Sequence, residues 1–138
     1  HGIVNQFLGD GFMATFGAPD SSGNDSQNAV IASLNIVKTL HEKYMSGELP
    51  KTKIGIGLHS GNIVSGNVGT TIRKQYSITG NTVILASRIE QLNKKYNSNI
   101  LISKEVLDCL DMKQLKTENL GNVVMKGRVE PIQIIKLI

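Results

Sequence analysis

Two short apolar runs separated by a three-residue turn constrain the fold of this chain more than any other feature. The runs are residues 2–8 and 12–16, and Gly9, Asp10 and Gly11 lie between them. Short apolar runs around Asp and Gly predict a β-hairpin. Asp10 is open to two interpretations, because Asp is a common turn former and its carboxylate is also a good metal ligand.

The rest of the sequence alternates between helical and strand patterns. Apolar residues at helical spacing predict helices over 26–44 and 82–96, and His41 lies on the apolar stripe of the first, which favours a packed histidine over a metal ligand. We expect 53–59 and 62–68 to form a second hairpin about Ser60 and Gly61. The remaining predictions are strands over 73–78, 99–103, 122–125 and 132–138 and a short helix over 104–110. This alternation indicates an α/β sandwich with antiparallel pairing.

Composition excludes several classes of protein. The chain has 138 residues, which suits one domain, and its single cysteine, Cys109, excludes an internal disulfide and favours a reducing compartment. The net charge of +4 comes from scattered basic residues, and there are three Phe, three Tyr and no Trp. A clustered nucleic-acid footprint or a stacking platform is therefore not expected. No apolar run is long enough to span a bilayer, and no stretch resembles a signal peptide.

Three stretches together resemble the class III nucleotidyl cyclase catalytic domain, the family of adenylate and guanylate cyclases. They are "FLGDGFMATFGAP", "GIGLHSGNIVSGNVG" and "YSITGNTVILASRIEQL". Their order and spacing agree with the family throughout, so the resemblance covers essentially residues 1–138. It implies a ferredoxin-like antiparallel sheet packed with helices (α+β). We expect the chain to begin inside that domain, without its first strand.

The resemblance implies a reaction at the interface of a head-to-tail homodimer. The 3′-hydroxyl of ATP or GTP attacks the α-phosphate, giving a 3′,5′-cyclic nucleotide and pyrophosphate with two ions of Mg²⁺ or Mn²⁺. Asp10 matches the second metal-binding aspartate, and the first is expected on the missing upstream strand. Arg88 matches the arginine that stabilises charge on the α-phosphate. One position departs from the family, since Ile84 stands where an asparagine is expected.

Four further residues match positions that bind the nucleotide. Gln6 and Ser77 match the pair that reads the purine edge, with Ile78 beside Ser77. A glutamine amide both donates and accepts, so Gln6 leaves the base open, whereas the Ser77 hydroxyl favours adenine. Lys126 matches a lysine that contacts the terminal phosphates. Gln6 and Ser77 could instead be ordinary polar strand residues, and Lys126 an ordinary exposed lysine.

Three functions follow from the resemblance, and one is set aside. The first is an adenylate cyclase of intracellular signalling, in the cytoplasm or tethered to a membrane by regions outside this chain, with an upstream sensor or regulatory domain. The second is a degenerate cyclase-like module that binds nucleotide or dimerises, which Ile84 favours, and the third is a cyclase that uses GTP. A diguanylate cyclase is set aside because its Gly-Gly-[Asp/Glu]-Glu-Phe hairpin is absent.

Overall fold

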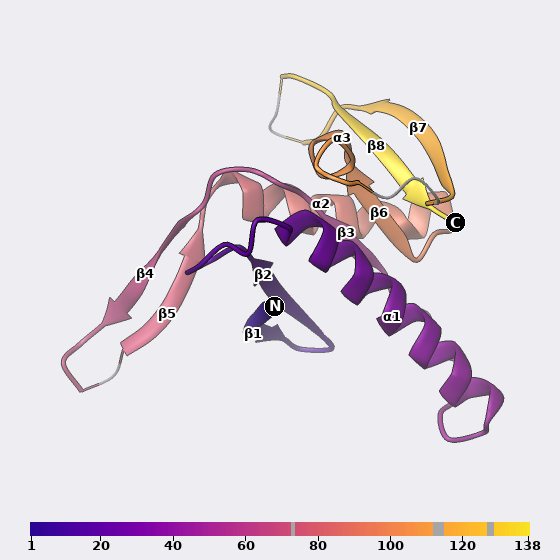
Figure 1. Cartoon of the computed structure of the whole chain (residues 1–138), viewed down its shortest axis with the longest axis horizontal. Coiled ribbons are helices and arrows are strands. Elements are labelled where there is room, and N and C mark those ends of the chain that lie inside the picture. Colours follow the sequence, from indigo (N-terminus) through magenta and orange to yellow (C-terminus); the bar gives the residue numbers. More distant parts are fainter. Residues whose placement is uncertain (73, 112–114, 127–128) are drawn as a thin grey trace.

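The computed structural model describes residues 1–72, 74–111, 115–126 and 129–138. Within these residues the chain forms strands and helices in alternation, as predicted (Figure 1). The strands are β1 (Gly2–Leu8), β2 (Gly11–Phe16), β3 (Ile56–Leu58), β4 (Val64–Gly69), β5 (Lys74–Thr79), β6 (Ile100–Ser103), β7 (Thr117–Val123) and β8 (Ile132–Leu137). The helices are α1 (Asp25–Met45), α2 (Asn81–Tyr96) and α3 (Lys104–Leu107). No helix in this part of the chain combines the length and apolar character needed to cross a membrane.

The strands form three separate sheets. β1 and β2 pair as one antiparallel hairpin, β4 and β5 as another, and the third sheet has the order β3-β6-β8-β7. The pairs β6–β8 and β7–β8 are antiparallel, and β3 runs parallel to β6. The expected α+β class with largely antiparallel sheets is therefore confirmed, with one parallel pair added.

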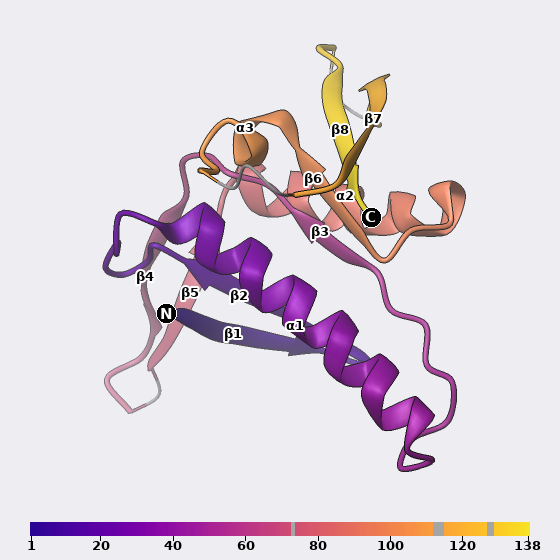
Figure 2. The same cartoon turned by 45° about the vertical axis from the view of Figure 1, so that its right-hand side comes forward.

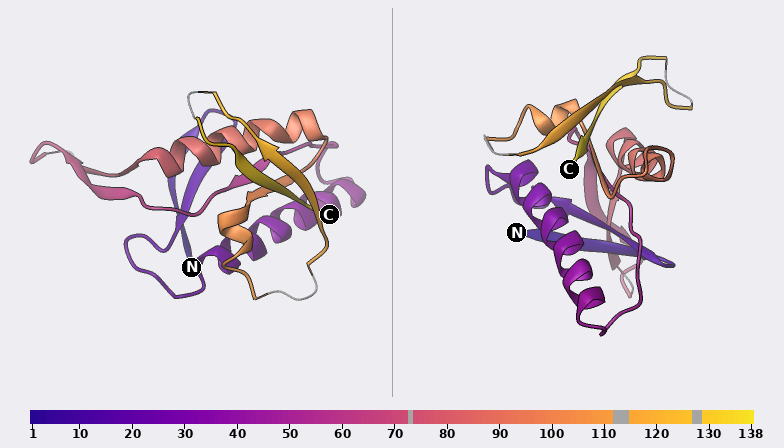
Figure 3. Two further views of the ribbon diagram at one scale, coloured as in Figure 1. Left: turned by 90° about the horizontal axis from the view of Figure 1, so that it is seen from above. Right: turned by 90° about the vertical axis from the view of Figure 1, so that its right-hand side faces the viewer.

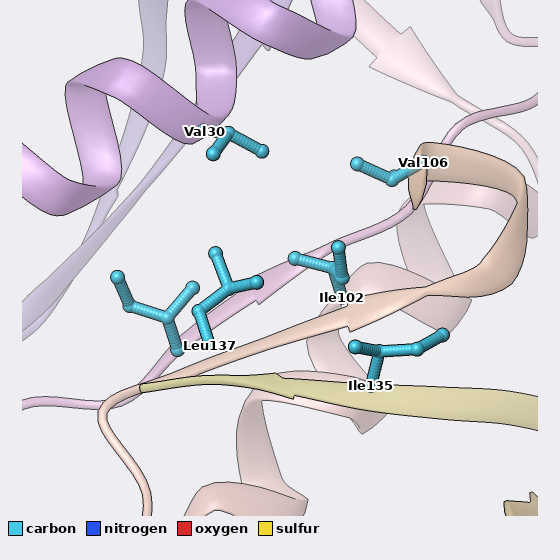
Figure 4. Close-up of a cluster of buried hydrophobic side chains, with 6 residues drawn as sticks. Val30, Ile102, Val106, Ile135 and Leu137 are labelled. Atoms are coloured by element: carbon cyan, nitrogen blue, oxygen red, sulfur yellow. The ribbon is translucent and has the colours of Figure 1, made fainter. Parts of the chain in front are cut away.

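Helices cover both faces of the four-stranded sheet, with α1 on one side and α2 on the other (Figure 3). Alternate residues of β6 point to opposite faces, because side chains alternate along a strand. Ile102 therefore joins the cluster under α1, with Val30, Val106, Ile135 and Leu137 (Figure 4). The cluster under α2 contains Leu85, Ile89, Leu101, Met125, Ile132 and Ile134. Both clusters are buried, so each helix is fixed to the sheet by its apolar side.

The predicted hairpin over 53–68 is wrong. β3 joins the four-stranded sheet beside β6, and β4 pairs instead with β5, from Val64 opposite Thr79 to Gly69 opposite Lys74. Residues 60–63 carry the chain across the N-terminal end of α2, where the Thr82 hydroxyl donates a hydrogen bond to the carbonyl of Asn62 at 2.6 Å. Ser60 and Gly61 are thus a crossing between sheets, and the β4–β5 ribbon projects from the body as an arm (Figure 1).

Helix α1 extends past the end of the four-stranded sheet (Figure 2). Val30, Leu34 and Val37 contact the core as expected. The prediction that His41 is packed was wrong, because His41 is exposed and lies beyond Val37, the last described α1 residue packed against the core.

Boundaries differ in the C-terminal third. α3 ends at Leu107, earlier than predicted, and its end continues as turns in which the N–H of Leu110 donates to the carbonyl of Leu107 at 3.0 Å. β7 begins at Thr117, five residues before the predicted strand, because it pairs with β8 as far as Thr117 opposite Leu137. Its first residues are polar and exposed, so the sequence carried no apolar signal there. Of the strand predicted over 73–78, Arg73 lies outside the described residues.

Candidate active site

Asp10 lies in the turn between β1 and β2, exposed at the end of the hairpin. Leu8 and Gly11 form the last pair of the ladder, and Gly9 has φ +70°, a left-handed conformation that glycine adopts without strain. The sequence thus folds a tight turn that holds a carboxylate clear of the strands. This carboxylate is a hard oxygen ligand of the kind that Mg²⁺ and Mn²⁺ prefer.

The described residues hold only part of a metal site. Among them, no group of three or more His, Cys, Asp or Glu side chains is arranged to hold a metal ion. Asp10 fits as one ligand of a metal site.

A β-bulge in β1 sets the direction of Gln6. Val4 pairs with Ala14, but Gln6 pairs with Met13, so Asn5 is an extra residue in β1. Val4, Ala14 and Phe16 line a hollow against α1, so they share the α1 side of the hairpin. Directly paired residues share a face, and Gln6 with Met13 is therefore on the opposite face. Without the bulge, the two-residue strand period would have put Gln6 on the same face as Val4.

Ser77 and Ile78 lie next to each other on β5 and point to opposite faces. Ser77 is half-buried, whereas the side chain of Ile78 is 7% exposed. Any contact of Ile78 with a ligand would therefore use its backbone. β1 and β5 are in contact although their backbones do not pair, which brings the strand of Gln6 against the strand of Ser77.

Arg88 is half-buried on α2, beside the buried stripe formed by Leu85 and Ile89. No carboxylate oxygen among the described residues lies within 4.0 Å of its guanidinium group. A half-buried guanidinium without an internal counter-ion can accept an anionic ligand through its fixed fork of donors. Ile84, one turn earlier, is 49% exposed and lies outside the core stripe.

Lys126 lies exposed between β7 and β8. Its neighbour Met125 is buried against Leu85 and Ile89 of α2, so Lys126 is tied to the helix that carries Arg88.

The structure also shows a polar cluster that sequence analysis does not predict. The His59 side chain is 7% exposed, and its Nδ1 lies 2.9 Å from Ser103 Oγ and 3.8 Å from Glu105 Oε2. The cluster joins the end of β3 to β6 and the start of α3. His59 lies within the motif "GIGLHSG", which is its only signal in the sequence.

These elements match a known family. The model of the adenylate and guanylate cyclase catalytic domain covers residues 5–136. The chain belongs to this family. Crystal structures of the adenylyl cyclase CyaB from P. aeruginosa and of the guanylyl cyclase Cya2 superpose with TM-scores of 0.79 and 0.83, each at 30% identity. The matches cover 99% of this cyclase domain and 71% and 69% of those chains, respectively.

Curated relatives are similar over almost the whole chain. Adenylate cyclase 1 of Rhizobium meliloti is 34% identical over 142 residues, which cover 99% of this cyclase domain and 21% of that protein. An uncharacterized protein of Mycobacterium tuberculosis is 33% identical over 135 residues, 97% of the chain and 23% of its own length. The chain thus spans about a quarter of the length of such relatives. Similarity favours neither base, because adenylyl and guanylyl cyclases match equally well.

Proposed function

We propose that this cyclase domain converts ATP to 3′,5′-cyclic AMP and pyrophosphate at the interface of a homodimer. The observation that carries the proposal is the half-buried Arg88 guanidinium, which has no carboxylate partner in the described part of the chain, on a helix fixed to the sheet. Asp10, in the turn between β1 and β2, would supply a carboxylate ligand to a divalent metal ion. Both residue types are those that phosphoryl transfer requires.

In the proposed reaction the 3′-oxygen of the ribose forms a bond to the α-phosphorus. The bond from that phosphorus to the bridging oxygen breaks, pyrophosphate leaves with the electron pair, and the 3′-hydroxyl proton passes to solvent. Arg88 balances the negative charge that develops on the α-phosphate oxygens. Lys126 binds the terminal phosphates as a point charge. Bound Mg²⁺ or Mn²⁺ on Asp10, and on an aspartate of the upstream strand, would lower the pKa of the attacking hydroxyl and neutralise the triphosphate.

Ser77 supports ATP as the substrate. Its hydroxyl can accept a hydrogen bond from the exocyclic amino group of adenine, and the Gln6 amide can complement the remaining ring edge. The bulge at Asn5 and the contact of β1 with β5 support a shared role for these two residues. GTP remains the alternative substrate, since a hydroxyl and an amide can also pair with guanine.

Exposed apolar side chains support the homodimer. On the β4–β5 arm, Val64 is 68% exposed, Val68 64% and Ile72, just past β4, 96%. Phe7 of the hairpin is 78% exposed. A two-stranded ribbon is marginally stable alone in water, and exposed apolar groups of this kind mark interaction surfaces. We propose that a second copy, arranged head to tail, covers them and completes each site with residues from both chains.

The exposed, free Cys109 is consistent with a reducing compartment, and we propose that the reaction takes place in the cytoplasm. An upstream sensor or regulatory domain is part of the same proposal.

One observation favours the second candidate function, a nucleotide-binding module without catalysis. Ile84 presents an apolar, exposed side chain where the family has an amide. The deciding experiment measures cyclic nucleotide formation by the full-length protein with ATP and GTP, each with Mg²⁺ and with Mn²⁺. Turnover of ATP supports the proposed function and faster turnover of GTP corrects the base, whereas nucleotide binding without turnover supports the module.

A further inference from the structure

The surface of α2 that carries Arg88 and Ile84 also carries Asn81. Positions 81 and 88 are seven residues apart, so they lie within about 20° of each other around the helix axis and about 10 Å apart along it. Ile84 lies between them. All three stand beside the core stripe of Leu85 and Ile89, and Asn81 and Ile84 are both exposed. Asn81 therefore belongs to the same edge of the helix as the proposed catalytic arginine.

Side-chain direction brings the two polar groups closer than their backbone positions suggest. Helical side chains tilt toward the helix N-terminus, and Arg88 is much longer than Asn81, so we expect its guanidinium group to lie over the turn that contains Ile84. Asn81 begins α2, and the residue before it, the N-cap Gly80, has no side chain to cover that end. In the described part of the chain no hydrogen bond occupies the Asn81 amide.

We propose that the Asn81 side-chain amide donates a hydrogen bond to the α-phosphate in the transition state, in place of the donor that Ile84 lacks. This inference rests on the proposed function and deepens it. An amide carries two N–H donors. A phosphate bound by Arg88 over the turn of Ile84 would have oxygens facing the start of α2. The donor acts on charge that grows as the 3′-oxygen attacks, so it raises the catalytic rate more than substrate affinity.

A second exposed amide on the same edge provides the matched control. Gln91 lies one turn beyond Arg88 and is exposed. By the same rule we expect its side chain to tilt toward the backbone of Arg88, while the Arg88 guanidinium group lies toward Ile84. Gln91 should therefore have no contact with the phosphate.

The experiment uses four variants of the full-length protein with ATP: Asn81→Ala, Ile84→Asn, the double variant and Gln91→Ala. We expect Asn81→Ala to lower kcat by about 10²-fold with little change in KM, as for the loss of one such donor. Adding Ile84→Asn to Asn81→Ala should restore most of that loss, while Ile84→Asn alone should change kcat less than about tenfold. Gln91→Ala should match the wild type, and all four should keep the wild-type melting temperature because these side chains are exposed.

The outcomes separate this inference from the proposed function. If the wild type is active and Asn81→Ala does not change its kcat, the inference is overturned and the proposed function stands. The same holds if Gln91→Ala lowers kcat instead of Asn81→Ala. If the wild type is inactive and Ile84→Asn is active, the site is intact but Asn81 supplies no donor. This outcome overturns the inference and leaves the proposed site standing. If the wild type and Ile84→Asn are both inactive, the inference and the proposed function are overturned together.

Discussion

Gly57 of β3 lies directly against the backbone of Glu90 on α2. A Cβ built at Gly57 would stand 2.3 Å from the Glu90 nitrogen and 2.5 Å from the Ala86 carbonyl oxygen, far inside van der Waals contact. The helix and the strand thus meet backbone to backbone, and only glycine allows it. This contact fixes the depth at which α2, and with it Arg88, sits on the sheet.

Gly57→Ala should destabilise the domain by about 3 kcal/mol, at the upper end for overpacking, because backbone atoms cannot turn aside as a side chain can. Urea unfolding followed by circular dichroism measures the change. Gly66→Ala on the β4–β5 arm is the matched control, since a Cβ there meets nothing within 4 Å. A Gly57→Ala protein as stable as Gly66→Ala would show that α2 can move away freely.

Asn93 ties the end of α2 to the start of β3, and replacing it should be costly. Its side chain donates to the Ile56 carbonyl at 3.0 Å and the Glu90 carbonyl at 2.9 Å, and the residue is 3% exposed. Asn93→Ala removes these two bonds and the bond that its Oδ1 accepts from Ser98, all at a buried position, so we expect a loss of about 2–4 kcal/mol in the same assay. Ser98→Ala, which removes only the 2.8 Å bond from Ser98 Oγ to Asn93 Oδ1, should cost about 1 kcal/mol. Equal losses in the two variants would contradict this account.

Adjacent residues of α2 should respond very differently to substitution. Ile84 is 49% exposed and Leu85 is 2% exposed, so one faces the proposed site and the other the core. Ile84→Asn should change the free energy of unfolding by no more than about 0.5 kcal/mol, whereas Leu85→Ala should lower it by about 2–5 kcal/mol. Thermal melts of both variants check this. A large loss with Ile84→Asn would place Ile84 in the core and remove it from the site.

Asp25, at the start of α1, should make stability depend on pH in acid. Hydrogen bonds from the Ser21 hydroxyl and the Ser22 N–H hold the pKa of its carboxyl below its usual value. A lowered folded-state pKa stabilises the fold above the unfolded-state pKa, about 3.9, and the effect is lost as pH falls through the lower folded value. The melting temperature of Asp25→Asn should therefore be below that of the wild type at pH 6, and the gap should narrow below about pH 4. A gap of the same size at pH 6 and below pH 4 would contradict this account.

A shared active site should be visible when inactive chains are mixed. In the full-length protein, Asp10→Ala and Arg88→Ala should each abolish cyclase activity, because the proposed dimer places these residues in one site but on different chains. Random re-pairing of an equal mixture makes half of the dimers mixed, each with one intact site of two, so about a quarter of wild-type activity should return. Mixed dimers, verified by tag pull-down, that stay inactive would rule out a site built from two chains.

Local patterns predicted the elements well, and long-range pairing less well. The Asp10 turn and both long helices follow from apolar spacing and turn residues, which act over a few neighbours. The partner of β3 could not be read in this way, because Ser60 and Gly61 look like a hairpin turn and only the contact of Gly57 with α2 shows otherwise. The contacts of β3 with β6 and α2 thus determine its pairing, which the local sequence pattern could not predict.

The candidate site shows the same division. Motif spacing identified Asp10, Ser77 and Arg88 as candidate site residues. Their roles stay predictions, which the experiments described above address. The face on which Gln6 lies depends on the extra residue in β1, and period-two alternation cannot reveal a bulge. His59 was missed as a link because its partners, Ser103 and Glu105, are more than forty positions away in sequence.

The division of the described strands into three sheets has a consequence for control. The contact at Gly57 and the hydrogen bond of Asn93 join α2 and the four-stranded sheet into one packed body. The two hairpins, which hold Asp10 and Gln6 on one and Ser77 on the other, share no backbone ladder with that body in the described residues. For the proposed cyclase, we therefore expect a regulatory signal to act by tilting these hairpins relative to Arg88. Turnover would then depend on whether the two hairpins are aligned with α2, which keeps its position on the sheet.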